Sequence, residues 1–166
     1  HALYPSDEWG FYDEQPCLQT AYHLLDVLRD YNVTATFYIL GVIASGNQSL
    51  IQSIKYFGHK IGSHGWSHSP LEREGDGFDQ QTRRYLPECV GYRPPYWNGA
   101  KRPGYGGGAF FRLLPYPMLK WEVERSGELY LHPHDLDLHP GMLRRTLSIG
   151  DPWQKLHRIL SEVKFA

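Results

Sequence analysis

The sequence predicts an α/β fold, in which helices alternate with the strands of a parallel sheet. Up to His64, two segments with the pattern of helices alternate with two short segments with the pattern of strands, an order typical of such sheets. Histidines follow the second of these strands, where α/β folds build their sites. The 166 residues suit one domain, spanning 1–166, and are few for a complete (β/α) barrel, so we expect an incomplete one.

The first two elements are a helix that lies between Pro16 and a stop at Tyr31–Asn32, and a strand over residues 33–41. Apolar residues of the helix recur at near-helical spacing: Leu18, Tyr22, Leu25, Val27 and Leu28. The strand, VTATFYILG, is β-branched, aromatic and nearly all apolar, and it ends at a glycine. These features predict a buried parallel strand.

The next two elements repeat this order. Residues 47–58, NQSLIQSIKYFG, predict a helix with Asn47 or Ser49 as its cap and a glycine at its end. Residues 59–64, HKIGSH, predict a short strand that runs into a loop. The helix–strand–helix–strand order therefore indicates parallel strands whose carboxyl ends share one edge.

The second half of the chain is less regular, and prolines and glycines set its boundaries. Its expected elements are a short helix over 78–85, a loop over 91–108, a helix over 110–127 interrupted by Pro115 and Pro117, a strand over 128–132, and a final helix over 152–165 opened by Asp151 and Pro152.

Charge and composition exclude several classes of partner. The net charge is −1, with 17 basic and 18 acidic residues mixed along the chain, so no one-sided basic field favours nucleic acid or an anionic membrane. We expect a soluble chain with no signal peptide and no transmembrane segment, and its localisation stays undetermined. Aromatics make up 14% of the residues and many lie beside glycine or proline, which suits either sugar rings or the capping of a small core.

Two histidine-bearing segments follow predicted strands. In GHKIGSHGWSH, His64 and His68 stand four residues apart, which allows both imidazoles to face one metal ion but also occurs in ordinary polar turns. The later segment YLHPHDLD places His132 and His134 after another predicted strand. The convergence of two such strand ends favours a metal site over a polar turn.

Four motifs in order resemble those of the polysaccharide deacetylases, the NodB-like carbohydrate esterases: LLDVLRDYNVTATFYILG, GHKIGSHGWSH, GYRPPYW and YLHPHDLD. The segments GGGAFFRLLPYPMLKW and KLHRILSEVKFA further resemble the subgroup linked to exopolysaccharide export and exosortase systems. The resemblance implies a distorted, incomplete (β/α) barrel of the polysaccharide deacetylase type. It also implies a metal-dependent carbohydrate deacetylase, a hydrolase acting on C–N bonds other than peptide bonds.

The resemblance also assigns roles to individual residues. It implies one divalent metal ion, with zinc as the first choice, held by His64, His68 and the carboxylate of Asp7. His132, in the LHP motif, matches the general acid that protonates the departing amine. The remaining matches are Arg93, which would orient a catalytic aspartate, and the sugar-binding residues Tyr96, Trp97 and Tyr105.

The sequence departs from the family pattern at the general base. In YPSDEW, Asp7 aligns with the metal-binding aspartate, but Ser6 stands where the family has the catalytic carboxylate. A hydroxyl cannot replace that group, so either Glu8 or Asp13 supplies the carboxylate or the first strand lies upstream of His1.

Three functions therefore compete. The first is a deacetylase acting on an N-acetylated or O-acetylated sugar of a cell-envelope or exported polysaccharide, with the acetylated oligo- or polysaccharide as its partner. The second is a catalytically silent carbohydrate-binding module on the same scaffold, which Ser6 would favour. The third is a metal hydrolase of a small amide.

Of the other histidines, His134 is the better candidate for a role near the site, whereas His23, His59 and His157 are expected to be structural or on the surface.

Overall fold

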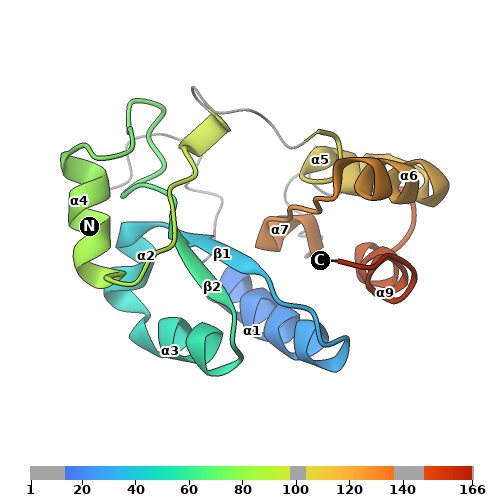
Figure 1. The fold of residues 1–166 in the computed structure, drawn as a ribbon, viewed down its shortest axis with the longest axis horizontal. Helices are drawn as coiled ribbons and strands as arrows, with labels where there is room; N and C mark the ends of the chain where they lie inside the picture. The colour runs from blue at the N-terminus through green and yellow to red at the C-terminus, as the bar shows by residue number, and fades with distance from the viewer. Residues whose placement is uncertain (1–13, 98–103, 137–147, 166) are drawn as a thin grey trace. The chain divides into compact units, whose positions relative to one another are not determined.

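The computed structural model describes residues 14–97, 104–136 and 148–165 (Figure 1). Ser6, Asp7, Glu8 and Asp13, which were considered for the metal and the base, lie outside the described residues. The chain divides into two compact units: a first made of His1–Tyr12 and Thr34–Arg102, and a second made of Asp13–Val33 and Pro103–Ala166. Each is described by itself, and the single domain 1–166 stays a prediction.

The first unit is built around a parallel pair of strands, β1 and β2, as the sequence predicts (Figure 1). Phe37 pairs with Ile61 and Ile39 with Ser63 across the two strands. The elements of this unit are β1 (Thr36–Ile39), α2 (Gly41–Gly46), α3 (Gln48–Tyr56), β2 (Lys60–Ser63), α4 (Gly77–Tyr85) and the short 3-10 helix η1 (Pro95–Trp97).

A third segment extends this sheet on the far side of β2. The N–H of Ser63 donates to the carbonyl of Gly91 at 2.8 Å, and the N–H of Arg93 donates to the carbonyl of Ser63 at 2.9 Å. These bonds form a parallel bridge between Ser63 and Tyr92. The RPPY motif is therefore aligned in register with the end of β2.

The structure corrects three details of the first half. The predicted strand over 33–41 contracts to β1, because α2, which the sequence did not reveal, begins at Gly41. The strand is less buried than predicted: Thr36 is exposed and only Ile39 is buried, since β1 has one hydrogen-bonded neighbour among the described strands. Asn47 precedes α3 as predicted, but its side chain donates to the carbonyl of Ile43 instead of capping the helix.

The second unit is helical. Its elements are α1 (Glu14–Asp30), α5 (Ala109–Leu113), α6 (Tyr116–Ser126), α7 (Pro133–Leu136) and α9 (Pro152–Glu162). The predicted break at Pro115 separates α5 from α6, and the Asp151 side chain caps α9 by accepting from the N–H of Gln154 at 2.8 Å. Its core is formed by fully buried side chains from four of these helices: Leu25, Phe111, Leu119, Val123, Leu156 and Ile159.

The predicted strand over 128–132 is wrong. Within the part of the chain that the structure describes, the segment makes a single parallel bridge, between Gly107 and Tyr130, and α7 begins three residues later at Pro133. A proline fixes φ in the helical range and lacks the N–H that a strand ladder needs, so it favours a helix start here. Gly107 is required at the bridge because a Cβ there would overlap the carbonyl of Tyr130.

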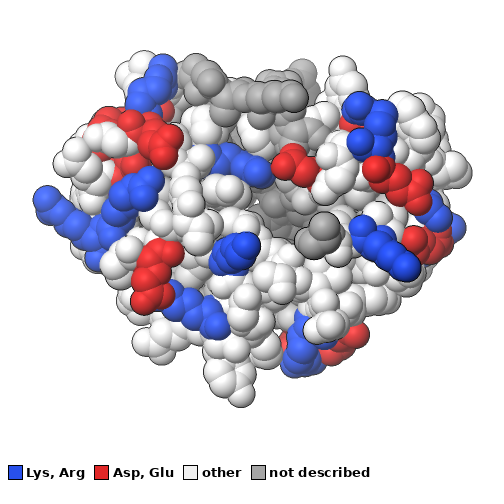
Figure 2. Space-filling model, viewed as in Figure 1, with Lys and Arg blue, Asp and Glu red and all other residues white. Residues whose placement is uncertain are grey.

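On the face drawn in Figure 2, basic and acidic side chains are interspersed, which agrees with their mixing along the sequence. Within the described residues, no helix is long and apolar enough to cross a membrane.

Candidate functional site

His64 directly follows the carboxyl end of β2. Its N–H donates to the carbonyl of Ile39 at 3.0 Å, which continues the β1–β2 ladder by one residue. The chain then turns through Gly65, whose φ of +81° favours glycine. The carbonyls of Gly65 and Trp66 accept from the N–H groups of Gly41 and Val42 at the start of α2, at 2.9 and 3.1 Å. The sheet and α2 therefore fix the backbone on both sides of this turn.

The bridge to the RPPY segment also fixes the tautomer of His64. Nδ1 of His64 lies 2.6 Å from the carbonyl oxygen of Arg93. Because a carbonyl only accepts, Nδ1 must carry the proton, and the neutral ring then has its lone pair at Nε2. An imidazole whose second nitrogen is held by a carbonyl is the usual arrangement of a metal-binding histidine.

The ring of His68 lies next to that of His64. The ring centroids of His64 and His68 lie 5.0 Å apart, and the ring of Tyr96 lies 4.7 Å from that of His68. Left-handed backbone is uncommon outside glycine, yet His68, Tyr96 and Trp97 have φ values of 64°, 55° and 58°. Such conformations gather where surrounding contacts impose them, often at functional sites. The structure thus brings together two predicted ligands and one predicted sugar-binding residue.

Arg93 points its guanidinium at aromatic rings. Its Cζ lies 4.3 Å from the centroid of the Tyr38 ring and 4.6 Å from that of Trp97. The Arg93 side chain therefore packs between two aromatic rings, while its carbonyl supports His64. The acids that Arg93 was expected to orient lie outside the described residues.

Two buried carboxylates lie behind the histidine turn. Glu72, 1% exposed, accepts from the N–H groups of Trp66, Ser67 and Ser69. Asp79, which is fully buried, accepts from the hydroxyl of Ser63 at 2.6 Å.

The environment of Asp79 keeps it ionised. Burial alone would raise the pKa of its carboxyl, but hydrogen bonds from Ser63, Gly75 and Arg83 bring that pKa below its ordinary value. Sequence reasoning missed both carboxylates. A signal for Glu72 was present, because SPLE has the serine and glutamate spacing of a capping box.

The second unit holds the other predicted catalytic group. Asp135, 1% exposed, accepts from the N–H of His132 at 2.9 Å, and its carboxylate lies 3.2 Å from Nδ1 of the same histidine. The buried guanidinium of Arg112 donates to Asp135 from 3.2 Å. His134 stacks on His132 with ring centroids 4.9 Å apart. Asp135 therefore orients His132, and Arg112 holds Asp135.

This group also has the composition of a metal site. One ligand atom each from His132, His134 and Asp135 lies within 4.8 Å of the others. The guanidinium of Arg112 already pairs with the carboxylate of Asp135 and places a positive charge beside it. Because like charges repel, this guanidinium disfavours a divalent ion at the cluster of His132, His134 and Asp135.

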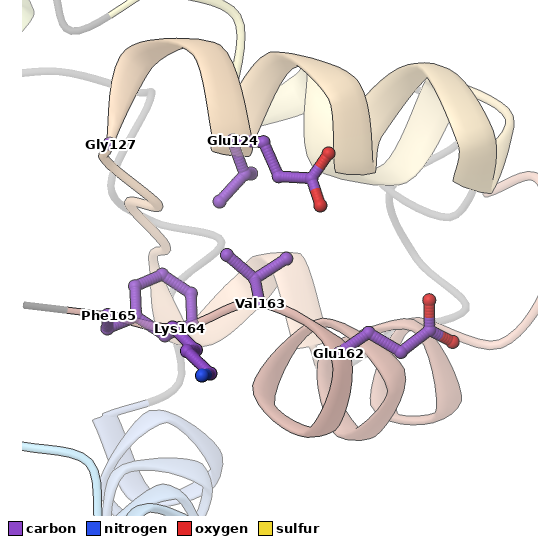
Figure 3. Close-up of a pocket in the computed structure, with 7 residues that line it drawn as sticks. Glu124, Gly127, Glu162, Val163, Lys164 and Phe165 are labelled. Carbon is purple, nitrogen blue, oxygen red and sulfur yellow. The ribbon is translucent and has the colours of Figure 1, made fainter.

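Tyr105 also lies in the second unit, so it is described apart from Tyr96 and Trp97. Its exposed ring packs edge-on against Phe110 at 4.7 Å between centroids, and its N–H donates to Glu122 at 3.0 Å. A separate hollow of about 340 Å³ lies between α6 and the segment after α9 (Figure 3). None of the residues predicted for the sugar cleft lines it; its walls are Val123, Glu124, Gly127, Glu162, Val163, Lys164 and Phe165.

Comparisons with solved structures show the class of fold. A family 4 carbohydrate esterase pseudoenzyme, in mutant form, matches with a TM-score of 0.60 and 16% identity, over 88% of this chain and 57% of its own. The family 4 carbohydrate esterase from Streptomyces lividans matches with a TM-score of 0.54 and 18% identity, over 86% of this chain and 80% of its own. The fold is that of the family 4 carbohydrate esterases. The predicted α/β class, with a distorted and incomplete (β/α) barrel, is confirmed.

Sequence comparisons show the family. The profile of the polysaccharide deacetylases matches residues 11–106, more than half of the chain, so the chain belongs to the polysaccharide deacetylase family. A peptidoglycan-N-acetylglucosamine deacetylase of Listeria monocytogenes is 29% identical over 72% of this chain and 26% of its own length. One of Bacillus cereus is 33% identical over 69% of this chain and 40% of its own length. The chain thus spans well under half the length of these relatives.

Proposed function

We propose that this chain is a metal-dependent carbohydrate deacetylase, a hydrolase that removes acetyl groups from an N-acetylated or O-acetylated sugar of a cell-envelope or exported polysaccharide. The domain would span residues 1–166. The observation that carries the proposal is the bond between Nδ1 of His64 and the Arg93 carbonyl, which leaves Nε2 as the ligand atom beside His68.

The relatives support the class of substrate. Those from Listeria monocytogenes and Bacillus cereus are named peptidoglycan-N-acetylglucosamine deacetylases, and a protein of Cryptococcus neoformans that is 34% identical over 53% of this chain is named a chitin deacetylase. All three names refer to polymers that carry N-acetylated sugars. An acetylated oligo- or polysaccharide is therefore the proposed substrate.

The described residues fit a divalent metal ion, for which zinc is our first choice. Two imidazoles on one rigid turn, one with its tautomer fixed, are suitable nitrogen donors, and Asp7 is the proposed third ligand. When bound, such an ion supplies Lewis-acid polarisation of the acetyl carbonyl.

The other residues divide the remaining tasks. His132 is the proposed general acid, which would protonate the departing sugar nitrogen or oxygen, and Asp135 holds its ring by the contact at Nδ1. Arg93 would orient the carboxylate that acts as base. Tyr96, Trp97 and Tyr105 would contact the sugar through their rings, which suit the apolar faces of a pyranose.

Ser6 supports a second candidate, a carbohydrate-binding module without turnover. The hydroxyl at this position cannot act as the carboxylate base. In that case the ligand site would persist, and replacing Ser6 by aspartate would restore hydrolysis.

The test is acetate release from acetylated chito-oligosaccharides and from an O-acetylated polymer, with a chelator and with added zinc. We expect zinc-dependent release that His64→Ala and His68→Ala abolish. Loss of the general acid in His132→Ala should slow it by roughly 100- to 10,000-fold. The matched control is His23→Ala, which removes an exposed histidine that packs on Trp153.

Two outcomes count against the proposal. Zinc binding unchanged in the His64 and His68 variants would refute the ligand assignment. Sugar binding without acetate release, converted to release by Ser6→Asp, would establish the binding module instead.

A further inference from the structure

We propose that Glu72 is a positioning residue, whose buried carboxylate holds the turn between His64 and His68 in its metal-binding shape. The inference rests on the proposed function in one respect, the assignment of these histidines as ligands. The shape of the turn itself can be tested without any metal.

The carboxylate of Glu72 gathers donors from the residues between and just after the two histidines. Oε2 accepts from the N–H of Trp66 at 2.5 Å. Oε1 accepts from the N–H and the hydroxyl of Ser67 at 2.9 and 2.7 Å, and from the N–H of Ser69 at 3.1 Å. A carboxylate has about four lone-pair sites, and Glu72 accepts four bonds, three at Oε1 and one at Oε2.

This arrangement exceeds what a turn needs for its own stability. In a capping box the glutamate returns one bond to the backbone N–H of the serine that begins the box. Here the bond to Ser69 fulfils that role, and the other three bonds go to Trp66 and Ser67, which lie between the histidines. The side chain therefore ties the local turn to the segment that positions both imidazoles.

Gly65 makes room for the carboxylate. A Cβ on Gly65 would overlap Oε2 of Glu72, and the φ of +81° at this glycine also disfavours any other residue. The HGWSH segment thus contains a glycine where the buried acid approaches the backbone. This close approach explains why Glu72, four residues beyond His68, influences the turn directly.

Loss of these bonds should weaken metal binding without removing a ligand. Three backbone N–H groups would lose a buried, charged acceptor, and the turn would sample other shapes. Apparent affinity falls in proportion to the fraction of molecules whose site is formed. Partners that orient ligands typically change metal affinity by about 10- to 100-fold when removed.

The test compares Glu72→Gln with Glu74→Gln. Glutamine keeps the volume of Glu72 but replaces one acceptor oxygen by an NH2 group, which cannot accept from a backbone N–H. Glu74 has the same charge two residues away, but its side chain is exposed and lies 3.8 Å from Arg83. Ser67→Ala is a milder variant that removes only the hydroxyl bond.

Zinc affinity, measured by competition with a chromophoric chelator, is the first readout. We expect Glu72→Gln to bind zinc roughly 10- to 100-fold more weakly, Ser67→Ala to show a smaller loss, and Glu74→Gln to match the wild type. Deacetylation by Glu72→Gln should recover as zinc is raised, which a general loss of folding would not allow. Wild-type zinc affinity in Glu72→Gln would overturn the inference.

Amide hydrogen exchange of the metal-free protein is the second readout. We expect faster exchange at Trp66, Ser67 and Ser69 in Glu72→Gln than in Glu74→Gln. Equal exchange in the two variants would overturn the inference whatever the metal does. If the wild type binds no zinc, the proposed function fails, and faster exchange in Glu72→Gln would still support the role of Glu72 in the turn.

Discussion

Acidification should destabilise this protein through His134. Burial lowers the pKa of its imidazole from 6.5 to about 4, and of its charged neighbours Asp135 opposes this shift while His132 and Arg112 add to it. Between pH 6.5 and 4, His134 therefore binds a proton in the unfolded chain but stays neutral in the folded chain. The free energy of unfolding is unaffected by His134 above pH 6.5 and falls as the pH is lowered through this window.

The size of the effect follows from the shift. At 1.36 kcal/mol per pKa unit, the loss on going from pH 7 to pH 5 is about 2 kcal/mol. For a chain of this length, that corresponds to a fall in Tm of roughly 4 to 8 °C. The loss arises because the buried ring, stacked on His132, must take up a proton in an environment that disfavours its charged form.

The assay is urea unfolding at pH 7 and pH 5 of the wild type and of His134→Gln, which keeps a polar side chain but cannot titrate. The variant should lose about 2 kcal/mol less than the wild type over this interval. Burial also lowers the pKa of His59, so both proteins share that contribution and the difference isolates His134. Equal losses in the two proteins would refute the reasoning.

Two further predictions concern buried charged groups of the second unit. Asp135→Ala should lower the free energy of unfolding by about 3 to 5 kcal/mol, because it leaves the buried Arg112 guanidinium without its carboxylate. The double variant Arg112→Met, Asp135→Leu removes both charges and should leave the free energy of unfolding nearly unchanged. A double variant as unstable as Asp135→Ala would contradict this account. Lys155→Met should cost about 1 to 3 kcal/mol in urea unfolding, since the buried ammonium donates to the carbonyls of Phe111, Arg112 and Leu114; an unchanged midpoint would contradict it.

The sequence predicted the elements whose signals are local. The 3.6-residue spacing of α1, the Asp151–Pro152 start of α9 and the proline break before α6 all depend on neighbouring residues. The segment 128–132 was predicted to be a strand, but it forms one bridge and no ladder with the other described residues. A strand needs a partner from elsewhere in the chain, and the local sequence does not supply one.

In the candidate site, too, some features could be predicted from the sequence and others could not. Motif order predicted that His64, His68 and Tyr96 belong together, and the structure places their rings in contact. The support of His64 by the Arg93 carbonyl could not be predicted, because it depends on which segment pairs with β2. Glu72 was missed for a different reason: its burial depends on three donors brought to it by the turn.

The division of the chain has a consequence for folding during synthesis. The first unit includes the continuous stretch Thr34–Arg102, whereas α1 belongs with residues that follow it. Tyr31, next to α1, bonds to His157 of α9 across 126 residues of chain, and α1 also packs against α7. Part of α1 must therefore remain uncovered until α7 and α9 have left the ribosome. The middle of the chain can complete its own strand pair in that interval, so the order of synthesis and the order of assembly differ in this protein.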